Sequence, residues 1–373
     1  MSPLRGEHAS KPTYRILDRL GDGRGDDVFL AHHEIFNGKC VQKTVDVHGL
    51  EDALASNEPA FLNQLDHSRI VPVREAQWDP EQGDRAITFV MPLLAGGSVA
   101  DALKEDYRFS IAQAITIATD ALDALAYLRR EFNALHRDTK PGNVLLDESR
   151  SHGYLSDFGS AATVDADGQA AAVLGTHIYR PPEVRSVGVV GSDADVYGIG
   201  FMLFEMLSGR IAWETLDLEQ VERRLQRGLR AVPDSWLEFA PHVPDRLRRC
   251  VRKAIHRDPA QRYGTPEAFI TALRKVRCID WRHTDGAGLQ GTWIGTWPPR
   301  LARDRRTEYR VTTRPLEAGR NRGRLPVESD FRKPRGGWRQ AVTDATVAPT
   351  ALAALADVFA AVEANAAQRS PAR

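Results

Sequence analysis

The chain has 373 residues, enough for two or three domains. Lysine plus arginine and aspartate plus glutamate each number 50, so the net charge does not indicate a nucleic-acid or membrane partner for the whole chain. A hydrophobic fraction of 42% and a charged fraction of 27% are typical of a globular protein. Cys40, Cys250 and Cys278 are scattered, which excludes a disulfide framework or a zinc site and favours a cytoplasmic location.

The first predicted unit is rich in strands and ends near Leu94. The tail before it, residues 1–13, lacks the apolar segment of a signal peptide, and no run of about 18 apolar residues predicts a membrane span. Alternating apolar positions predict strands, and apolar residues at helical spacing predict a helix. The predictions are strand, glycine-rich turn and strand over 14–33, a strand over 38–47, a helix over 53–65, and strands over 70–78 and 85–94.

Helical patterns dominate residues 95–278. Ser110 is a predicted N-cap for a helix that runs to about Arg130 with one apolar stripe. Residues 193–207 are apolar nearly all round, which predicts a buried helix. Two more amphipathic helices are predicted near 245–256 and 266–276.

The composition changes after about Cys278, and we expect a domain boundary near residue 279. The stretch 281–340 is rich in Arg, Gly and Trp; its GTWIGTW and TEYRVTT segments predict strands, and a helix is predicted over 350–366. One interpretation is a nucleic-acid surface with arginines on phosphates and tryptophans stacking on bases. The favoured interpretation is a small β-rich domain with the tryptophans in its core. The helix then packs on this domain or mediates self-association.

The segment LGDGRGDDVFLA (20–31) is a glycine-rich turn between two predicted strands. Glycines such as Gly21 and Gly23 let backbone N–H groups approach phosphate oxygens. Lys43 stands alone in the next strand, and Glu58 lies on the predicted helix that follows. An ion pair between them would hold the ammonium toward nucleotide phosphates. As an exposed surface pair it would contribute only about 0–1 kcal/mol.

The segment LHRDTKPGNVLLD (135–147) places an acid, a base and an amide between two apolar ends. Asp138 is suited to accept or orient the proton of a hydroxyl group, and Lys140 to neutralise charge on a transferred phosphoryl group. Asn143 offers an amide oxygen, and Asp157 in YLSDFGS offers a carboxylate, both suited to Mg²⁺. Each piece alone is typical of a surface loop, whereas all of them in this order favour phosphoryl transfer.

These residues resemble the eukaryotic-type (Hanks-type) serine/threonine protein kinases, in a bacterial style. The matching segments are GDGRGDDV, Lys43, Glu58, HRDTKPGN, DFG, GTHIYRPPE, DVYGIG and HRDPAQR, which span residues 14–277. The resemblance implies an α+β, two-lobed kinase fold with the N-lobe at 14–94 and the C-lobe at 95–278. It implies Mg²⁺-assisted transfer of the γ-phosphoryl group of ATP to Ser or Thr of proteins, including self-phosphorylation. Residues 279–373 resemble no family and would form an accessory domain.

The resemblance also implies a role for each matched side chain. Lys43, oriented by Glu58, would hold the α- and β-phosphates; Asp138 would be the catalytic aspartate, and Lys140 would contact the γ-phosphate. Asn143 and Asp157 would hold Mg²⁺. Other ATP contacts would come from the glycine loop (Gly21, Gly23), the adenine site (Leu20, Val28, Val41, Leu145), the gatekeeper Met91 and the hinge (Pro92, Leu94).

Three structural roles follow from the same resemblance. Leu62 would pack with Phe158 and His136 in an apolar stack between the lobes. Asp195 would brace the catalytic loop. Glu183 and Arg262 would form a buried ion pair.

The chain departs from the family pattern in two regions. Asp26 replaces the third glycine of the loop and Asp27 follows it, which we expect to lower nucleotide affinity; Val41 and Pro92 are milder departures. The activation segment has alanines where a regulatory phosphosite would lie, although Arg137, the usual partner of that phosphate, is present. We therefore expect either phosphorylation of Thr163, or an acidic residue such as Asp165 or Asp167 as the partner of Arg137. Thr176 would help to position the catalytic aspartate.

Three other functions remain as alternatives. The first is a pseudokinase-like scaffold that controls the C-terminal module, which the intact Lys43, Asp138, Asn143 and Asp157 argue against. The second is a kinase for small molecules, and the third is a nucleic-acid-binding effector that phosphorylation switches. We expect protein substrates, a protein partner rather than nucleic acid for the C-terminal domain, and no membrane partner.

Overall fold

The computed structural model forms two compact units, which divide after Ala95. Each unit is described by itself. The described residues are 13–20, 27–46, 58–79, 83–172, 178–297, 306–317, 320, 322–348 and 350–369.

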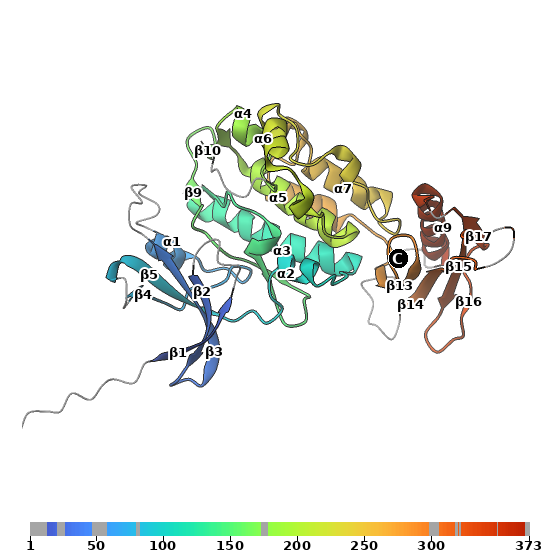
Figure 1. Cartoon of the computed structure of the whole chain (residues 1–373), viewed down its shortest axis with the longest axis horizontal. Helices are drawn as coiled ribbons and strands as arrows, with labels where there is room; N and C mark the ends of the chain where they lie inside the picture. Colours follow the sequence, from blue (N-terminus) through green and yellow to red (C-terminus); the bar gives the residue numbers. More distant parts are fainter. Residues whose placement is uncertain are drawn as a thin grey trace, which may run out of the picture. The chain divides into compact units, whose positions relative to one another are not determined.

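The first unit is built on one antiparallel sheet with the strand order β1-β2-β3-β5-β4 (Figure 1). Ala31, Cys40 and Val90 form a buried cluster against which Tyr14 packs. The strand predicted over 70–78 begins later, at Glu75, because Pro72 has no N–H group to donate to a sheet. The elements are β1 Tyr14–Leu20, β2 Asp27–His33, β3 Gly38–Asp46, α1 Glu58–Gln64, β4 Glu75–Asp79 and β5 Gly83–Pro92.

Helices dominate the second unit up to residue 274, and all four predicted ones are present. Ser110 caps α3 through a capping box, in which its hydroxyl accepts from the N–H of Gln113 and the Gln113 side chain accepts from the N–H of Ser110. The helices are α2 Val99–Lys104, α3 Ile111–Phe132, α4 Glu183–Ser186, α5 Ser192–Ser208, α6 Leu218–Gln226, α7 Asp245–Ala254 and α8 Pro266–Arg274.

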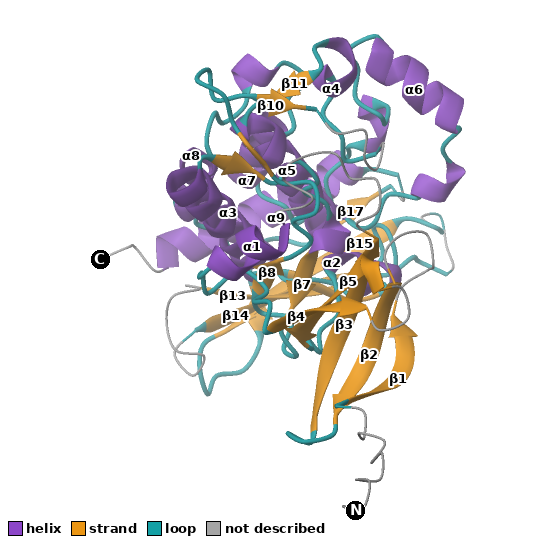
Figure 2. Cartoon of the chain, turned by 90° about the vertical axis from the view of Figure 1, so that its left-hand side faces the viewer, coloured by secondary structure: helices purple, strands orange, loops and turns teal. Residues whose placement is uncertain are grey.

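Helices α3 and α5 form the core of this part of the chain and pack against each other (Figure 2). Helix α5 is buried along nearly its whole length, as its all-round apolar sequence predicts. Within the described part of the chain, α3 is long and apolar enough to cross a membrane by length and composition. More than half of that window is buried against α5, α8 and other elements of this unit, and this burial accounts for its apolar character.

Short strand pairs hold the loops between α3 and α5. Two residues pair with two in each of the ladders β6–β9 and β10–β11, and three with three in β7–β8. Their bounds are β6 Ala134–Leu135, β7 Val144–Leu146, β8 Gly153–Leu155, β9 Ala162–Thr163, β10 Ala170–Ala171 and β11 Val189–Val190. These ladders position the loop 136–143 and the segment that follows Asp157.

A second sheet and a helix make up the C-terminal region of the second unit. Its strand order is β12-β13-β14-β15-β16, with β17 also paired to β15. Trp281 and Trp293 are fully buried and both contact Phe359 of α9. They form a core, as the favoured interpretation expects, and cannot stack on bases. The elements are β12 Arg282–Asp285, β13 Gly291–Trp297, β14 Thr307–Thr313, β15 Leu325–Arg332, β16 Arg339–Gln340, β17 Ala345–Val347 and α9 Leu352–Arg369.

Two arginines of this sheet, Arg310 and Arg332, are paired with acids of the same sheet. The Trp338 ring lies against two guanidinium groups, those of Arg310 and Arg332. Arg310 forms an ion pair with Asp330, and Arg332 forms one with Glu308. These pairs neutralise the positive charge that a nucleic-acid surface would need at this point.

The C-terminal sheet is joined to the helical part through the first turn of α3. The first backbone N–H groups of a helix have no partner inside it. Here the N–H of Ile111 donates to the carbonyl oxygen of Trp281 at 3.0 Å, and that of Ala112 donates to the Asp280 carboxylate at 2.8 Å. These hydrogen bonds connect residues before position 279 with residues after it. The domain boundary near residue 279 stays a prediction.

Glu363 of α9 makes the stability of this region sensitive to pH. Burial raises its pKa from 4.5 to about 7, and the Oε1 atom has no hydrogen-bond partner among the described residues. Between these two values the folded protein keeps a proton on Glu363 that the unfolded chain has lost. The free energy of unfolding therefore falls as the pH rises from 4.5 through about 7.

We expect Glu363→Gln to be more stable than the wild type by about 1–3 kcal/mol above this window, and equal to it at the acidic end. Urea unfolding at pH values on both sides of the window measures the difference. The buried His242 and the half-buried His283 titrate in the opposite sense, and their contribution cancels between the two proteins. Glu328→Gln, at an exposed position of β15, is the control. A wild type and variant whose stabilities differ equally at every pH would contradict the assignment.

Candidate active site

The loop 136–143 is held by one buried carboxylate from α5. The backbone N–H groups of His136 and Arg137 each donate to Asp195 at 2.9 Å, and the Thr139 hydroxyl donates to the Asp195 carbonyl oxygen. Burial raises the pKa of Asp195, and these two N–H donors oppose that rise. A side chain at Gly198 would lie 2.1 Å from the Thr139 Oγ1 atom, so only glycine permits this approach. The predicted bracing by Asp195 is confirmed.

Three predicted polar side chains converge within this loop. Lys140 Nζ donates to Asp138 Oδ2 at 2.6 Å, and Asn143 Nδ2 donates to the same oxygen at 3.0 Å. Asn143 Nδ2 also donates to the Asp138 backbone carbonyl at 2.7 Å. Both side chains of the ion pair are about four-fifths buried, at 24% and 19% exposed. Asp138 is thus held in one orientation, with a cation and an amide on one carboxylate oxygen.

Two non-glycine residues near this cluster have left-handed backbone conformations. Arg137 and Asp157 both have φ of 64°. Such values cost free energy for residues with side chains and are concentrated at functional sites. The next residue, Phe158, contacts the His136 ring edge-on at 5.1 Å, which is one part of the predicted apolar stack. Leu62, its third predicted member, belongs to the other unit.

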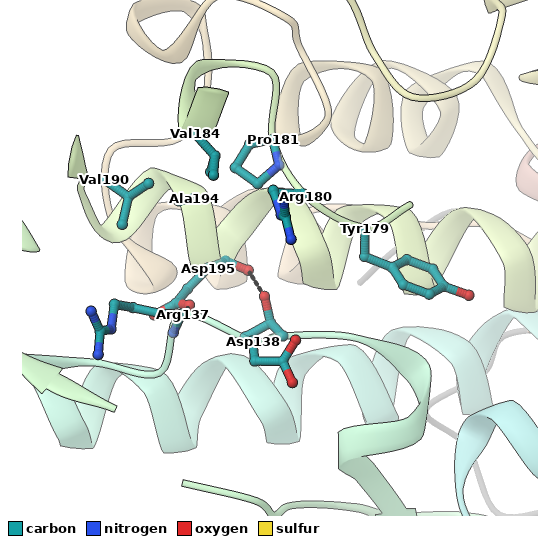
Figure 3. A pocket seen from close by; sticks show the side chains of 10 residues that line it. Arg137, Asp138, Tyr179, Arg180, Pro181, Val184, Val190, Ala194 and Asp195 are labelled. Carbon is teal, nitrogen blue, oxygen red and sulfur yellow. Dashed lines mark hydrogen bonds between the residues drawn. The ribbon is translucent and has the colours of Figure 1, made fainter. Parts of the chain in front are cut away.

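Asp138 also lines a small pocket, and residues 179–184 of a later segment form another part of its wall. The pocket has a volume of about 30 Å³. In Figure 3, Asp138 lies on the side of the loop, while Arg180 and Pro181 lie on the side of the later segment. Asp138 therefore borders a space that is large enough for a small group such as a hydroxyl.

One network that positions this segment is not evident from the motifs. Glu205 of α5 is fully buried and accepts from the Tyr179 hydroxyl, from Trp213 Nε1 and from the N–H of Ile211, all within 3.0 Å. Burial raises the pKa of Glu205, and these donors oppose the rise. The only signal in the sequence was one acidic residue in the later half of an otherwise apolar helix.

The predicted ion pair between Glu183 and Arg262 is confirmed. The guanidinium donates to both carboxylate oxygens, at 2.6 and 2.7 Å, and contacts Asp193 at 3.1 Å. The Arg262 side chain is fully buried and lies over the Tyr197 ring. Helix α4, which contains Glu183, is thereby linked to the loop before α8, and the contact of Arg262 with Asp193 links that loop to α5.

In the first unit, five candidate side chains share one face of the sheet. Residues directly opposite each other in antiparallel strands point to the same side, as do residues two apart in a strand. Leu20 pairs with Val28, which pairs with Lys43; Val41 pairs with Met91. Lys43 is therefore placed beside the apolar candidates, as a nucleotide-binding face requires.

The remaining candidates are placed as follows. Pro92 ends β5, Leu94 lies half-buried just after it, and Leu145 lies in β7 of the second unit. Gly21, Gly23 and Asp26 lie outside the described residues, and Glu58 begins α1 with its side chain outside the described set. The neighbouring Asp27 forms an ion pair with Arg19 at 2.5 Å, which directs its charge to a cation of β1.

The side chain of Arg137 binds backbone carbonyl groups of the activation segment. Its guanidinium donates to the carbonyl oxygens of Ser160 at 2.6 Å and Ala171 at 2.7 Å. Asp165 accepts from the N–H groups of Asp167 and Gln169 and so closes its own turn. Thr163 is exposed in β9, and Thr176 lies outside the described residues. The carbonyl contacts of Arg137 are a third arrangement, beside the two that we expected.

Comparison with known proteins agrees with this geometry. Residues 14–272 match the family model described as the protein kinase domain. The chain is 27% identical over 260 residues to "Serine/threonine-protein kinase PrkC" of Bacillus subtilis, covering 68% of this chain and 39% of that protein. It is 26% identical over 278 residues to "Probable serine/threonine-protein kinase PknB" of Lactococcus lactis, covering 72% and 43%.

A third relative comes from Streptomyces coelicolor. The chain is 28% identical over 275 residues to "Serine/threonine-protein kinase PksC", covering 70% of this chain and 49% of that protein. In all three comparisons, the matched region spans less than half of the relative.

Proposed function

This chain belongs to the protein kinase domain family, and on that premise we propose that it transfers the γ-phosphoryl group of ATP to serine or threonine hydroxyls of proteins. The observation that carries the proposal is the held carboxylate of Asp138 at the edge of the pocket with Arg180 and Pro181. An acceptor hydroxyl in that pocket would lie against a carboxylate able to orient it and to receive its proton. The likeness to serine/threonine kinases supports the choice of acceptor.

Each of the assigned residues has a separate role in the reaction. Asp138 orients the acceptor hydroxyl for in-line attack, and Lys140, two residues away, carries positive charge to the transferred phosphoryl oxygens. Lys43 holds the α- and β-phosphates, and the apolar residues on its face of the sheet hold the adenine. Catalysis of this kind depends on positioning and charge, which the hydrogen bonds from Asp195 and Asn143 maintain.

The donor set fits Mg²⁺ as the metal. Asn143 uses its Nδ2 atom to donate to Asp138. The other end of its amide, the Oδ1 atom, would then serve as a ligand of the metal. Asp157 supplies a carboxylate, and oxygen ligands of this kind suit a hard cation. Bound there, Mg²⁺ would neutralise charge on the phosphate oxygens. Asn143 also holds the carboxylate of Asp138 in position through these hydrogen bonds.

A pseudokinase-like scaffold is the weaker candidate. The polar residues that phosphoryl transfer requires are intact, and those in the loop 136–143 are hydrogen-bonded in an ordered arrangement. We propose a cytoplasmic enzyme in which residues 279–373 serve as an accessory domain that contacts a protein partner rather than nucleic acid. Self-phosphorylation is proposed as a further activity.

The activation segment does not need a phosphate at its customary place, we propose, because Arg137 already binds two of its carbonyl oxygens. We expect Thr163→Ala to retain wild-type transfer activity, and protein treated with a phosphatase to remain active. Mass-spectrometric mapping of active protein should find no stoichiometric phosphate between Ser160 and Thr176. Inactivation by the phosphatase together with a required phosphate on Thr176 would contradict the proposal.

The proposed function is tested with Lys43→Ala. Loss of this ammonium should lower labelling of a protein acceptor from γ-labelled ATP by about 10²–10³-fold, since it removes a charge from the phosphates. Phosphoamino-acid analysis should find the label on serine or threonine. Lys39→Ala, an exposed lysine of the same strand, is the matched control and should retain activity. Label that forms equally with all three proteins would refute the enzyme function.

A further inference from the structure

A second cavity lies inside the second unit, away from the residues assigned to phosphoryl transfer. It lies between the loop that joins α2 to α3, the end of α5, the loop 240–242 and the start of the C-terminal sheet. Its volume is about 220 Å³. One water molecule occupies about 30 Å³ of liquid, so the cavity has room for roughly seven or for one small organic molecule.

A guanidinium group without a carboxylate partner lines this cavity. Arg108 donates to Nδ1 of His283 and, at 2.7 Å, to the carbonyl oxygen of Gly286, both of which are neutral acceptors. Among the described residues Arg108 forms no ion pair, although its side chain is half-buried. The other arginine of the lining, Arg210, is paired with Glu214. Arg108 is therefore the one cation of this lining that has no ion-pair partner among the described residues. The two carboxylates of the lining, Asp106 and Glu205, form no ion pair with it, and Glu205 accepts instead from Tyr179, Trp213 and the N–H of Ile211.

Two buried ring nitrogens in the lining also have no hydrogen-bond partner. They are Nδ1 of His242, which is 7% exposed, and Nε1 of Trp293, which is 1% exposed. A buried polar atom left unpaired costs about 1–3 kcal/mol, so such atoms usually mark a missing water or ligand. Burial lowers the pKa of His242 to about 3 and that of His283 to about 4, and Arg108 contributes to both shifts. The histidines are neutral at pH 7, and Arg108 supplies the positive charge.

Four buried apolar side chains form another part of the wall. Leu103, Phe109, Met206 and Leu207 are all at most 6% exposed, and they line the cavity beside the polar groups. A ligand that satisfies this lining has a negative, hydrogen-bond-accepting end and an apolar body. A carboxylate suits Arg108 because it is planar and accepts charge-assisted hydrogen bonds, while the indole N–H of Trp293 can only donate.

We propose that this cavity is a binding site for a small carboxylate with an aromatic or aliphatic body. Its carboxylate lies toward Arg108 and Trp293, and its body packs on Leu103, Phe109, Met206 and Leu207. The site does not depend on the phosphoryl-transfer function, because none of the residues assigned to that function lines it.

The test uses the full chain with phenylacetate, benzoate and butyrate as probes, and phenylacetamide as the uncharged counterpart. Calorimetric titration should give at least one carboxylate that binds about tenfold or more tightly than the amide, since a charge-assisted hydrogen bond contributes about 1.5–3 kcal/mol. Arg108→Gln should remove this preference, and Trp293→Phe should weaken binding several-fold. Trp236→Phe, at an exposed position outside the cavity, is the matched control and should bind as the wild type does.

One further variant and two refuting outcomes keep the proposal open to test. Ala240 also lines the cavity, and Ala240→Leu, which places a larger side chain there, should abolish binding while circular dichroism and the Tm report a folded protein. The failure of all three carboxylates to bind at millimolar concentration would mean that the cavity holds only water. Equal binding to the wild type and to folded Arg108→Gln or Ala240→Leu would place the ligand elsewhere. Either result overturns the proposal, and neither affects the kinase assignment.

Discussion

Asp138→Asn is expected to lower the rate of phosphoryl transfer by about 10²–10⁴-fold, the usual contribution of a positioned acid or base. The amide has the shape of the carboxylate but cannot receive a proton from the acceptor hydroxyl. It also loses the charge that holds Lys140 at 2.6 Å. Transfer from γ-labelled ATP to a protein acceptor measures the effect at saturating nucleotide.

The controls separate chemistry from folding and binding. The variant should keep the Tm of the wild type to within a few degrees, because Asp138 is held at the surface of a pocket and not in the core. It should also keep its affinity for ATP, since Asp138 is not assigned to the nucleotide. Asp357→Asn, at an exposed position of α9, should be fully active. Equal incorporation by Asp138→Asn and the wild type would remove the enzyme function.

Arg262→Met is expected to lower the free energy of unfolding by about 3–5 kcal/mol, because it leaves the buried Glu183 carboxylate without its cation. Asp193 loses a contact as well, and burial already raises the pKa of that residue. Urea denaturation followed by tryptophan fluorescence measures the loss.

The exposed ion pair between Arg223 and Glu219 provides the comparison. Arg223→Ala should change the free energy of unfolding by less than about 1 kcal/mol, since exposed pairs contribute little. The double variant Arg262→Met with Glu183→Met should recover part of the loss, because it removes both buried charges. A loss for Arg262→Met as small as that for Arg223→Ala would show that the bidentate pair does not stabilise the fold.

Local patterns predicted the helices well and the strands less completely. Ser110 and the apolar stripe after it predicted α3, because a cap and a helical period involve only neighbouring residues. The short helix α2 was not predicted, although Ser98 and Asp101 form its capping box. The strand β15 was also not predicted, since Pro326 cannot donate to a sheet and obscures the alternation that follows it.

The candidate site was predicted as a set of residues and not as an arrangement. Asp138, Lys140 and Asn143 are close in sequence, and their convergence follows from one short loop. The contact of Arg137 with Ser160 and Ala171 depends on a chain that returns over 34 residues, and no periodicity encodes that path. The same holds for Tyr179 and Glu205, which different elements bring together.

The sequence by itself determined the chemistry of this protein: which acids, bases and amides are present, in which order, and which segments have an apolar face. These properties reside in single residues and their near neighbours. The tertiary structure alone decided that Arg137 donates to the carbonyl groups of Ser160 and Ala171, that Glu205 joins Tyr179 to Trp213, and that Arg108 lines a cavity without an ion-pair partner among the described residues. Burial and the pairing of charges depend on contacts between residues far apart in the chain, which only the packed fold specifies.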